Sequence, residues 1–229
     1  MSDEKPQAGD ELEVRDEEAP EFDESKSAPA DRETAGPFDI LEVPAMRPYV
    51  DLGAVKVMPR EGLQLRLEVD ERSSRVVAVT LDYAESIVQL QAFSAPKSTG
   101  LWHRVRGEVG QQLSAQGAKV REQQGEFGPE LLVQSPVPKD QGGGTRVVRF
   151  VGVDGPRWLL RGVIMGKAVV DAEAQTKVQE LFREVVVVRG DGPMPPGELL
   201  PLKMPAGVQA GAQGPGAQGS GAQGGSAQA

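Results

Sequence analysis

Arginines are the side chains in this sequence best suited to binding chemistry, and they concentrate in the stretch Thr145–Gly166. Guanidinium groups bind carboxylates and phosphates through paired hydrogen bonds, and a nearby aromatic ring can stack on a nucleic-acid base. Side chains alternate across a strand, so Arg157 and Arg161 are predicted to share one face and Trp158 to take the other. The odd step between Arg146 and Arg149 predicts opposite faces for that pair.

Two interpretations of these arginines stay open. Two or three of them, with Phe150 or Trp158 nearby, would hold an anionic ligand or a single-stranded nucleic acid. Alternatively, their charged ends reach solvent at the rim of a sheet or pair with the acids of a following helix. The candidate ligand-binding residues are therefore Arg146, Arg149, Arg157, Arg161 and Trp158.

Catalytic chemistry has few candidates in this chain. The single histidine, His103, lies beside the apolar stripe of a predicted helix, where it is either a base, a ligand or a surface residue. A zinc site would need more nitrogen or thiolate ligands, and the chain has no cysteine. The run Gly142–Gly144 lacks the Lys-Ser/Thr of a phosphate-binding loop, and no Gly-x-Ser-x-Gly elbow accompanies His103. We therefore expect no enzyme activity, no cofactor and no metal site.

Two Asp-Gly dipeptides, Asp154-Gly155 and Asp191-Gly192, invite an interpretation as catalytic or calcium-binding acids. The alternating acids and final Glu of a calcium-binding loop are missing around both. Asp-Gly is also a common turn dipeptide. We expect both to be turns, the first of them joining two strands within Thr145–Gly166.

Charge is distributed unevenly along the chain. Residues 1–36 carry 13 acids and 4 bases, a net charge of −9 that equals that of the whole chain, so residues 37–229 are formally neutral. A neutral body lacks the basic excess of a dedicated duplex-binding domain. The acidic segment 1–36 is predicted to be a disordered tail, either solubilising or binding a basic partner. Residues 205–229, rich in Gly, Ala and Gln, are predicted to be a second disordered tail.

The region between the tails, residues 37–204, suits a single domain. Period-two alternation, clearest at Leu63–Val69, predicts strands, whereas apolar residues three and four apart predict helices. The predicted class is α+β, a mainly antiparallel sheet of about seven to nine strands covered by two amphipathic helices. The predicted strands are 49–58, 63–69, 75–83, 86–93, 118–123, 130–137, two within 145–166, and 185–189; the predicted helices begin near Ser98 or Thr99 and at Asp171.

Several long runs resemble an uncharacterised actinobacterial family, domain-of-unknown-function family 3710. They are residues 36–39, 63–69, 89–96, 149–158 and 187–196, and the resemblance covers 36–204. Membership implies no activity, because the family has none assigned. The order of helix and hairpin is also similar to small α/β/α domains of the Mog1/PsbP type, which implies a fold but no function.

Together these observations favour a non-catalytic cytoplasmic interaction module that binds a protein or a small anionic ligand. The alternative is an accessory protein that binds nucleic acid or nucleotide through the arginine-bearing hairpin 145–166. The acidic N-terminal sequence lacks the apolar region of a secretory signal, and no apolar run is long enough to cross a membrane. A membrane partner is therefore not expected, and the oligomeric state is not predicted.

Overall fold

The computed structural model describes residues 23–44, 46–137, 140 and 143–205. They form a seven-stranded antiparallel sheet, a four-stranded mixed sheet and two main helices, which confirms the predicted α+β class. Of the two predicted tails, only residues 23–36 and residue 205 lie within the described part of the chain. Gly142, from the predicted glycine-rich loop, also lies outside it.

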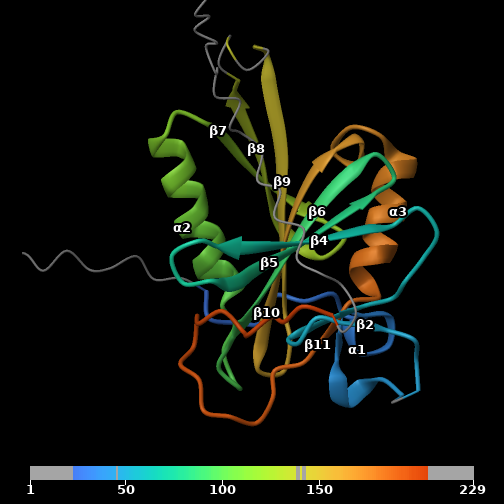
Figure 1. Ribbon diagram of the computed structural model, residues 1–229. Helices are drawn as coiled ribbons and strands as arrows, with labels where there is room; N and C mark the ends of the chain where they lie inside the picture. Colours follow the sequence, from blue (N-terminus) through green and yellow to red (C-terminus); the bar gives the residue numbers. More distant parts are fainter. Residues whose placement is uncertain (1–22, 45, 138–139, 141–142, 206–229) are drawn as a thin grey trace, which may run out of the picture.

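The large sheet is strongly twisted, since β4 and β5 run nearly crosswise to β9 and β10 in Figure 1. Its strand order is β4-β5-β6-β10-β9-β8-β7. The bounds are β4 (Gln64–Asp70), β5 (Arg75–Tyr83), β6 (Ser86–Ser94), β7 (Lys119–Gly125), β8 (Gly128–Pro136), β9 (Thr145–Asp154) and β10 (Trp158–Gly166).

Alternation along each strand divides the sheet into two faces. In β6, Val88 and Leu90 are buried on one face, while Gln89 and Gln91 are half-buried on the other. Strand β10 continues this division, because its residues pair directly with those of β6 and β9 and directly paired side chains share a face. The predicted hairpin within Thr145–Gly166 is confirmed as β9–β10.

One helix packs on each face of the large sheet (Figure 1). Helix α2 (Trp102–Ala115) contacts β7, β8 and β9, and its Trp102 lies against Gly152, where a Cβ would stand only 2.8 Å from the indole Cε2. Helix α3 (Ala172–Arg183) packs on the other face, where Phe182 lies against Gly162. Asp171 caps α3 as predicted, its side chain accepting from Ala174 N at 2.9 Å.

The small sheet was not foreseen from the sequence. The predicted strand 49–58 is a hairpin of two short strands, β2 (Val50–Asp51) and β3 (Val55–Val57), because Gly53 at φ 86° reverses the chain and donates to Asp51. The predicted strand 185–189 contributes only β11 (Val186–Val187), which lies between β3 and β1 (Phe38–Asp39).

Residues 23–44, here named the N-terminal strap, pack along the body. They include α1 (Arg32–Ala35) and the 3-10 helix η1 (Ile40–Glu42). Arg32 is buried and makes two hydrogen bonds to the Glu42 carboxylate, at 2.8 and 2.6 Å, with its guanidinium 5.9 Å from the Trp158 ring. The packed part of the chain therefore begins before the boundary that composition predicted at residue 36.

Acid is expected to loosen this strap through Glu42. Burial by itself raises the pKa of Glu42, but hydrogen bonds from Arg32 and from Asp39 N, with the Arg32 charge, outweigh it and hold that pKa below its ordinary value. Because the folded pKa is depressed, the contribution is present above about pH 4.5 and is lost as pH falls through the folded pKa. We expect Glu42→Gln to lower the free energy of unfolding by about 1–2 kcal/mol at pH 7.

The measurement is urea unfolding of the wild type and Glu42→Gln from pH 7 to pH 3. The two stabilities should converge toward the acid end, because the wild-type carboxylate is then protonated. Glu33→Gln is the matched control, since Glu33 is exposed and lies 3.7 Å from the same arginine. An equal loss of stability at every pH would contradict the linkage.

Candidate functional site

The structure does not gather the five predicted binding residues on one surface. Arg149 and Trp158 lie on the α3 face of the sheet, and Arg161 lies on the α2 face. The predicted opposition of Trp158 and Arg161 is thus confirmed. Arg146 is exposed on β9, and Arg157 is exposed in the turn before β10.

Trp158 and Arg149 hold the core together. Trp158 is 0% exposed, and its Nε1 donates to Asp39 Oδ2 at 2.8 Å. Arg149 is buried beside Glu130, with 3.6 Å between its Nε and Glu130 Oε1, under the first turns of α3. Both side chains are already committed inside the protein, so neither is available to a ligand.

Arg157 has an acidic neighbour of its own. Its Nη2 lies 3.8 Å from the Asp191 carboxylate and 3.5 Å from the carbonyl of Gly190. Asp191 is fully exposed, as expected for the Asp-Gly turn. The sequence left open a pairing of the arginines with acids of the following helix, but the partner of Arg157 lies in the turn after β11 and not in α3.

Arg161 is different, because it is half-buried without a counter-charge. Within the described residues, no carboxylate lies within 4.0 Å of its guanidinium. Its Nη2 donates to Gln91 Oε1, its guanidinium carbon lies 5.4 Å from the centre of the Phe93 ring, and its Nε is buried without a partner. Burial lowers the pKa of Arg161, so the surroundings disfavour its charge.

Gln91 orients Arg161 from the neighbouring strand. The two residues are directly paired across β6 and β10, and Gln91 Nε2 donates to Val77 O at 3.0 Å. With its amide nitrogen bonded to β5, Gln91 turns its carbonyl oxygen toward the guanidinium. The arginine is thus held in place, yet only part of its donor capacity is used.

The main contacts of both helices lie away from Arg161, although Leu101 and Trp102 at the start of α2 pack beside Phe93. Helix α2 lies over β7, β8 and β9, and α3 packs on the opposite face. The α2 side of β6 and β10 therefore carries a row of half-buried side chains, mostly apolar, which we name the open face. It consists of Ile87, Gln89, Gln91, Phe93, Arg161, Val163 and Met165.

A polar cluster borders the open face toward β4. The Glu68 carboxylate accepts hydrogen bonds from Thr80 Oγ1 and from Gln89 Nε2, the second at 2.6 Å. These bonds link three strands, so Glu68 is committed to the sheet and does not neutralise Arg161. The open face thus combines one unpaired cation with apolar neighbours.

The family of the chain is now clear. A family profile described as "Protein of unknown function (DUF3710)" matches residues 36–211. The chain belongs to the DUF3710 family. Neither a curated protein nor a solved structure matches it, and the likeness to the Mog1/PsbP type stays a prediction. The family description names no activity, so the geometry must carry any proposal about this DUF3710 protein.

Asp154 is the residue whose role sequence reasoning missed. It was predicted to be a turn residue, but its carboxylate is buried and accepts from Ser27 N, Leu101 N and Trp102 N at 3.0, 2.9 and 3.3 Å. It therefore caps α2, which the sequence assigned to Ser98 or Thr99. The Lys26 Nζ reaches the carbonyls of Gly155 and Pro156 and closes the same junction.

His103 lies between an acid and an arginine in this DUF3710 fold. Its Nε2 lies 3.7 Å from Asp23 Oδ2, and its Nδ1 lies 3.1 Å from Arg106 Nη1. Among the described residues, no group of three or more His, Asp or Glu side chains is placed to hold a metal ion. Nor does any helix in the described part of the chain have the length and apolar character to cross a membrane.

Proposed function

We propose that this protein is a non-catalytic interaction module that binds an acidic segment of a protein partner on the open face, with Arg161 as the anchor. The observation that carries the proposal is the unpaired, half-buried Arg161 among apolar neighbours. A cation in such surroundings loses hydration without gaining a counter-charge. A carboxylate from a partner would supply that charge and accept the unused N–H groups.

The chemistry of the open face supports a peptide ligand. An arginine held in place by Gln91 and Phe93 is suited to paired hydrogen bonds with a carboxylate. Val163 and Met165, which follow Arg161 at every second position of β10, offer apolar contacts on the same side. An extended segment with one acid and apolar residues at alternate positions would match this row.

Nucleic-acid binding finds less support in the same geometry. Binding a single strand needs a basic track with exposed aromatic rings for stacking. Trp158 is buried, Arg149 faces the core, and Arg157 pairs with Asp191. The hairpin 145–166 therefore offers scattered cations, and this alternative enters only as an outcome of the binding test.

Binding should depend on Arg161 and weaken with salt. The probe is an acidic peptide with alternating glutamate and leucine, titrated into the full chain by calorimetry. We expect Arg161→Gln to weaken peptide binding at least roughly ten-fold, because a charge-assisted pair contributes about 1.5–3 kcal/mol. Arg157→Gln is the matched control and should change the affinity less than about two-fold, since exposed pairs contribute little.

Arg161→Gln should leave the fold intact, because an unpaired, half-buried cation adds little to stability. We expect its free energy of unfolding to stay within about 1 kcal/mol of the wild type. Equal peptide affinity of the wild type and Arg161→Gln would refute the proposed anchor. Binding of a single-stranded thymidine oligonucleotide that is weakened by Arg157→Gln would favour the nucleic-acid alternative instead.

A further inference from the structure

The described chain begins close to the open face. Asp23 lies beside His103 in the first turn of α2, and the carbonyl of Glu24 accepts from Gly100 N at 2.9 Å. The first residue of α2, Trp102, packs on Gly152, which pairs directly with Arg161 across β9 and β10. A few direct neighbours therefore separate Asp23 from Arg161. Residues 1–22 are joined to the described chain at Asp23.

Residues 10–18 have the composition that the open face would bind. They read Asp-Glu-Leu-Glu-Val-Arg-Asp-Glu-Glu, with six acids and one base. In an extended chain, Asp10, Leu12, Val14 and Asp16 share one side, because side chains alternate with a period of two. That side carries two apolar residues between two carboxylates.

The spacing of the side chains in residues 10–18 and the length of chain between them and Asp23 both fit binding along β10. Asp16, Val14 and Leu12 follow one another at the two-residue interval of Arg161, Val163 and Met165. Asp16 lies seven positions before Asp23, which gives a reach of up to about 25 Å when the chain is extended. Arg161 is the member of the row next to Gly152 and Trp102, so a chain arriving from Asp23 would meet it first.

We propose that residues 10–18 bind intramolecularly to the open face, with Asp16 on Arg161 and Val14 and Leu12 on Val163 and Met165. This inference rests on the proposed function, because it uses Arg161 as a carboxylate site. The tethered segment is present at a millimolar effective concentration, so even a weak contact competes with a partner in solution. The acidic segment thus acts as a built-in competitor that a partner must displace.

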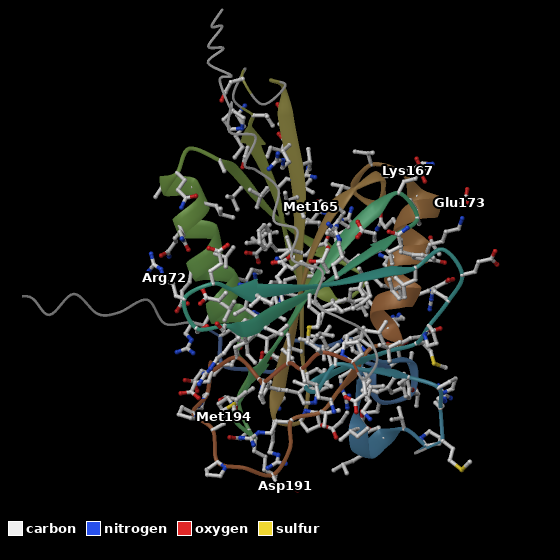
Figure 2. All side chains as sticks on the ribbon, in the orientation of Figure 1. Arg72, Met165, Lys167, Glu173, Asp191 and Met194 are labelled. Atoms are coloured by element: carbon white, nitrogen blue, oxygen red, sulfur yellow. The ribbon has the colours of Figure 1, made fainter. Side chains whose placement is uncertain are left out.

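A spin label in the full chain tests this contact directly. The chain has no cysteine, so Ala8→Cys provides a single attachment point for a nitroxide. Bound residues 10–18 would bring the label near Met165 and broaden its methyl NMR signal. Met194 is the internal reference, because Figure 2 shows it far from Met165. We expect the Met165 signal to be broadened at least roughly three-fold more than that of Met194, and 0.5 M salt to remove the difference.

Matched substitutions separate a specific contact from general attraction. Asp16→Asn and Arg161→Gln should each abolish the excess broadening at Met165. Asp3→Asn removes the same charge from the chain before residues 10–18 and should leave the broadening unchanged. Asp16→Asn should also raise the affinity for the added acidic peptide by roughly three- to ten-fold, since the internal competitor is weakened. Equal broadening at Met165 and Met194 would overturn the inference.

The two proposals fail in different ways. If the added peptide binds at Arg161 but Met165 shows no excess broadening, the internal contact is refuted and the binding module stands. If Met165 is broadened in an Arg161-dependent manner but no added peptide binds even to Asp16→Asn, the internal contact stands and the binding of a partner is refuted. An equal loss of broadening in Asp3→Asn and Asp16→Asn would show nonspecific charge attraction and refute the proposed register.

Discussion

Replacing Asp154 by alanine is expected to lower the free energy of unfolding by roughly 3–5 kcal/mol, because a buried anion with charge-assisted bonds would be lost. Asp154 is 2% exposed, and its carboxylate accepts hydrogen bonds from three backbone N–H groups, those of Ser27, Leu101 and Trp102. Without it, these donors would stay buried and unsatisfied. The start of α2 and the strap at Ser27 would lose their common attachment to the sheet.

Urea unfolding monitored by tryptophan fluorescence measures this effect. Asp191→Ala is the matched control, since Asp191 also precedes a glycine in a turn but is exposed, and it should cost less than about 0.5 kcal/mol. Hydrogen exchange of the Leu101 and Trp102 amides should accelerate in Asp154→Ala beyond the change in global stability. A loss below about 1 kcal/mol would show that the carboxylate does not hold the junction.

Arg149→Met is expected to destabilise the protein by roughly 3–5 kcal/mol, in contrast to the small effect expected for Arg161→Gln. The side chains of Arg149 and Glu130 are only 9% and 4% exposed, so the substitution would leave a buried carboxylate without its counter-charge. Glu130 Oε1 would then keep only the hydrogen bond from Gln123 Nε2, at 2.7 Å.

A double-mutant cycle tests this pair. Combining Arg149→Met with Glu130→Gln removes both charges and should recover at least about half of the lost stability, because the unpaired buried carboxylate causes most of the loss. Arg157→Met serves as the exposed control. Additive losses in the double mutant would mean that the two charges do not interact.

Arg149 and Arg161 together show why the arginines of one hairpin have different roles. Arg149 has a buried acid beside it and contributes to the fold, whereas Arg161 has no carboxylate within reach among the described residues. A protein selected for stability alone would gain by replacing Arg161 with an apolar residue. The uncompensated charge of Arg161 is therefore the feature of this sheet that points most directly to a ligand.

Local patterns in the sequence predicted most of the large sheet. Alternation at Leu63–Val69 predicted β4, the breaker Asp154-Gly155-Pro156 between two apolar runs predicted the β9–β10 hairpin, and Asp171 predicted the start of α3. Each signal depends on residues a few positions apart, so the strand or helix can be predicted without knowing which other segments it packs against.

The small sheet could not be predicted in this way. Its strands are two or three residues long and pair Phe38 with Val186 and Val187 with Val55, across distances in sequence that no local pattern records. The same holds for Asp154, which caps a helix that begins some fifty residues earlier in the chain. Such contacts exist only once the sheet has brought the segments together.

For the candidate site, the sequence by itself placed Trp158 and Arg161 on opposite faces of one strand and showed that an acidic segment precedes the body. It did not show that Arg157, predicted to share the face of Arg161, lies in the turn before β10. Tertiary structure alone decided which of those arginines is half-buried without a counter-charge among the described residues. A guanidinium is neutralised only where another strand or helix brings a carboxylate beside it, as Glu130 of β8 lies beside Arg149. Its exposure depends on which face of the sheet a helix covers. Long-range packing places α2 over β7–β9 and leaves Arg161 beside it on the open face.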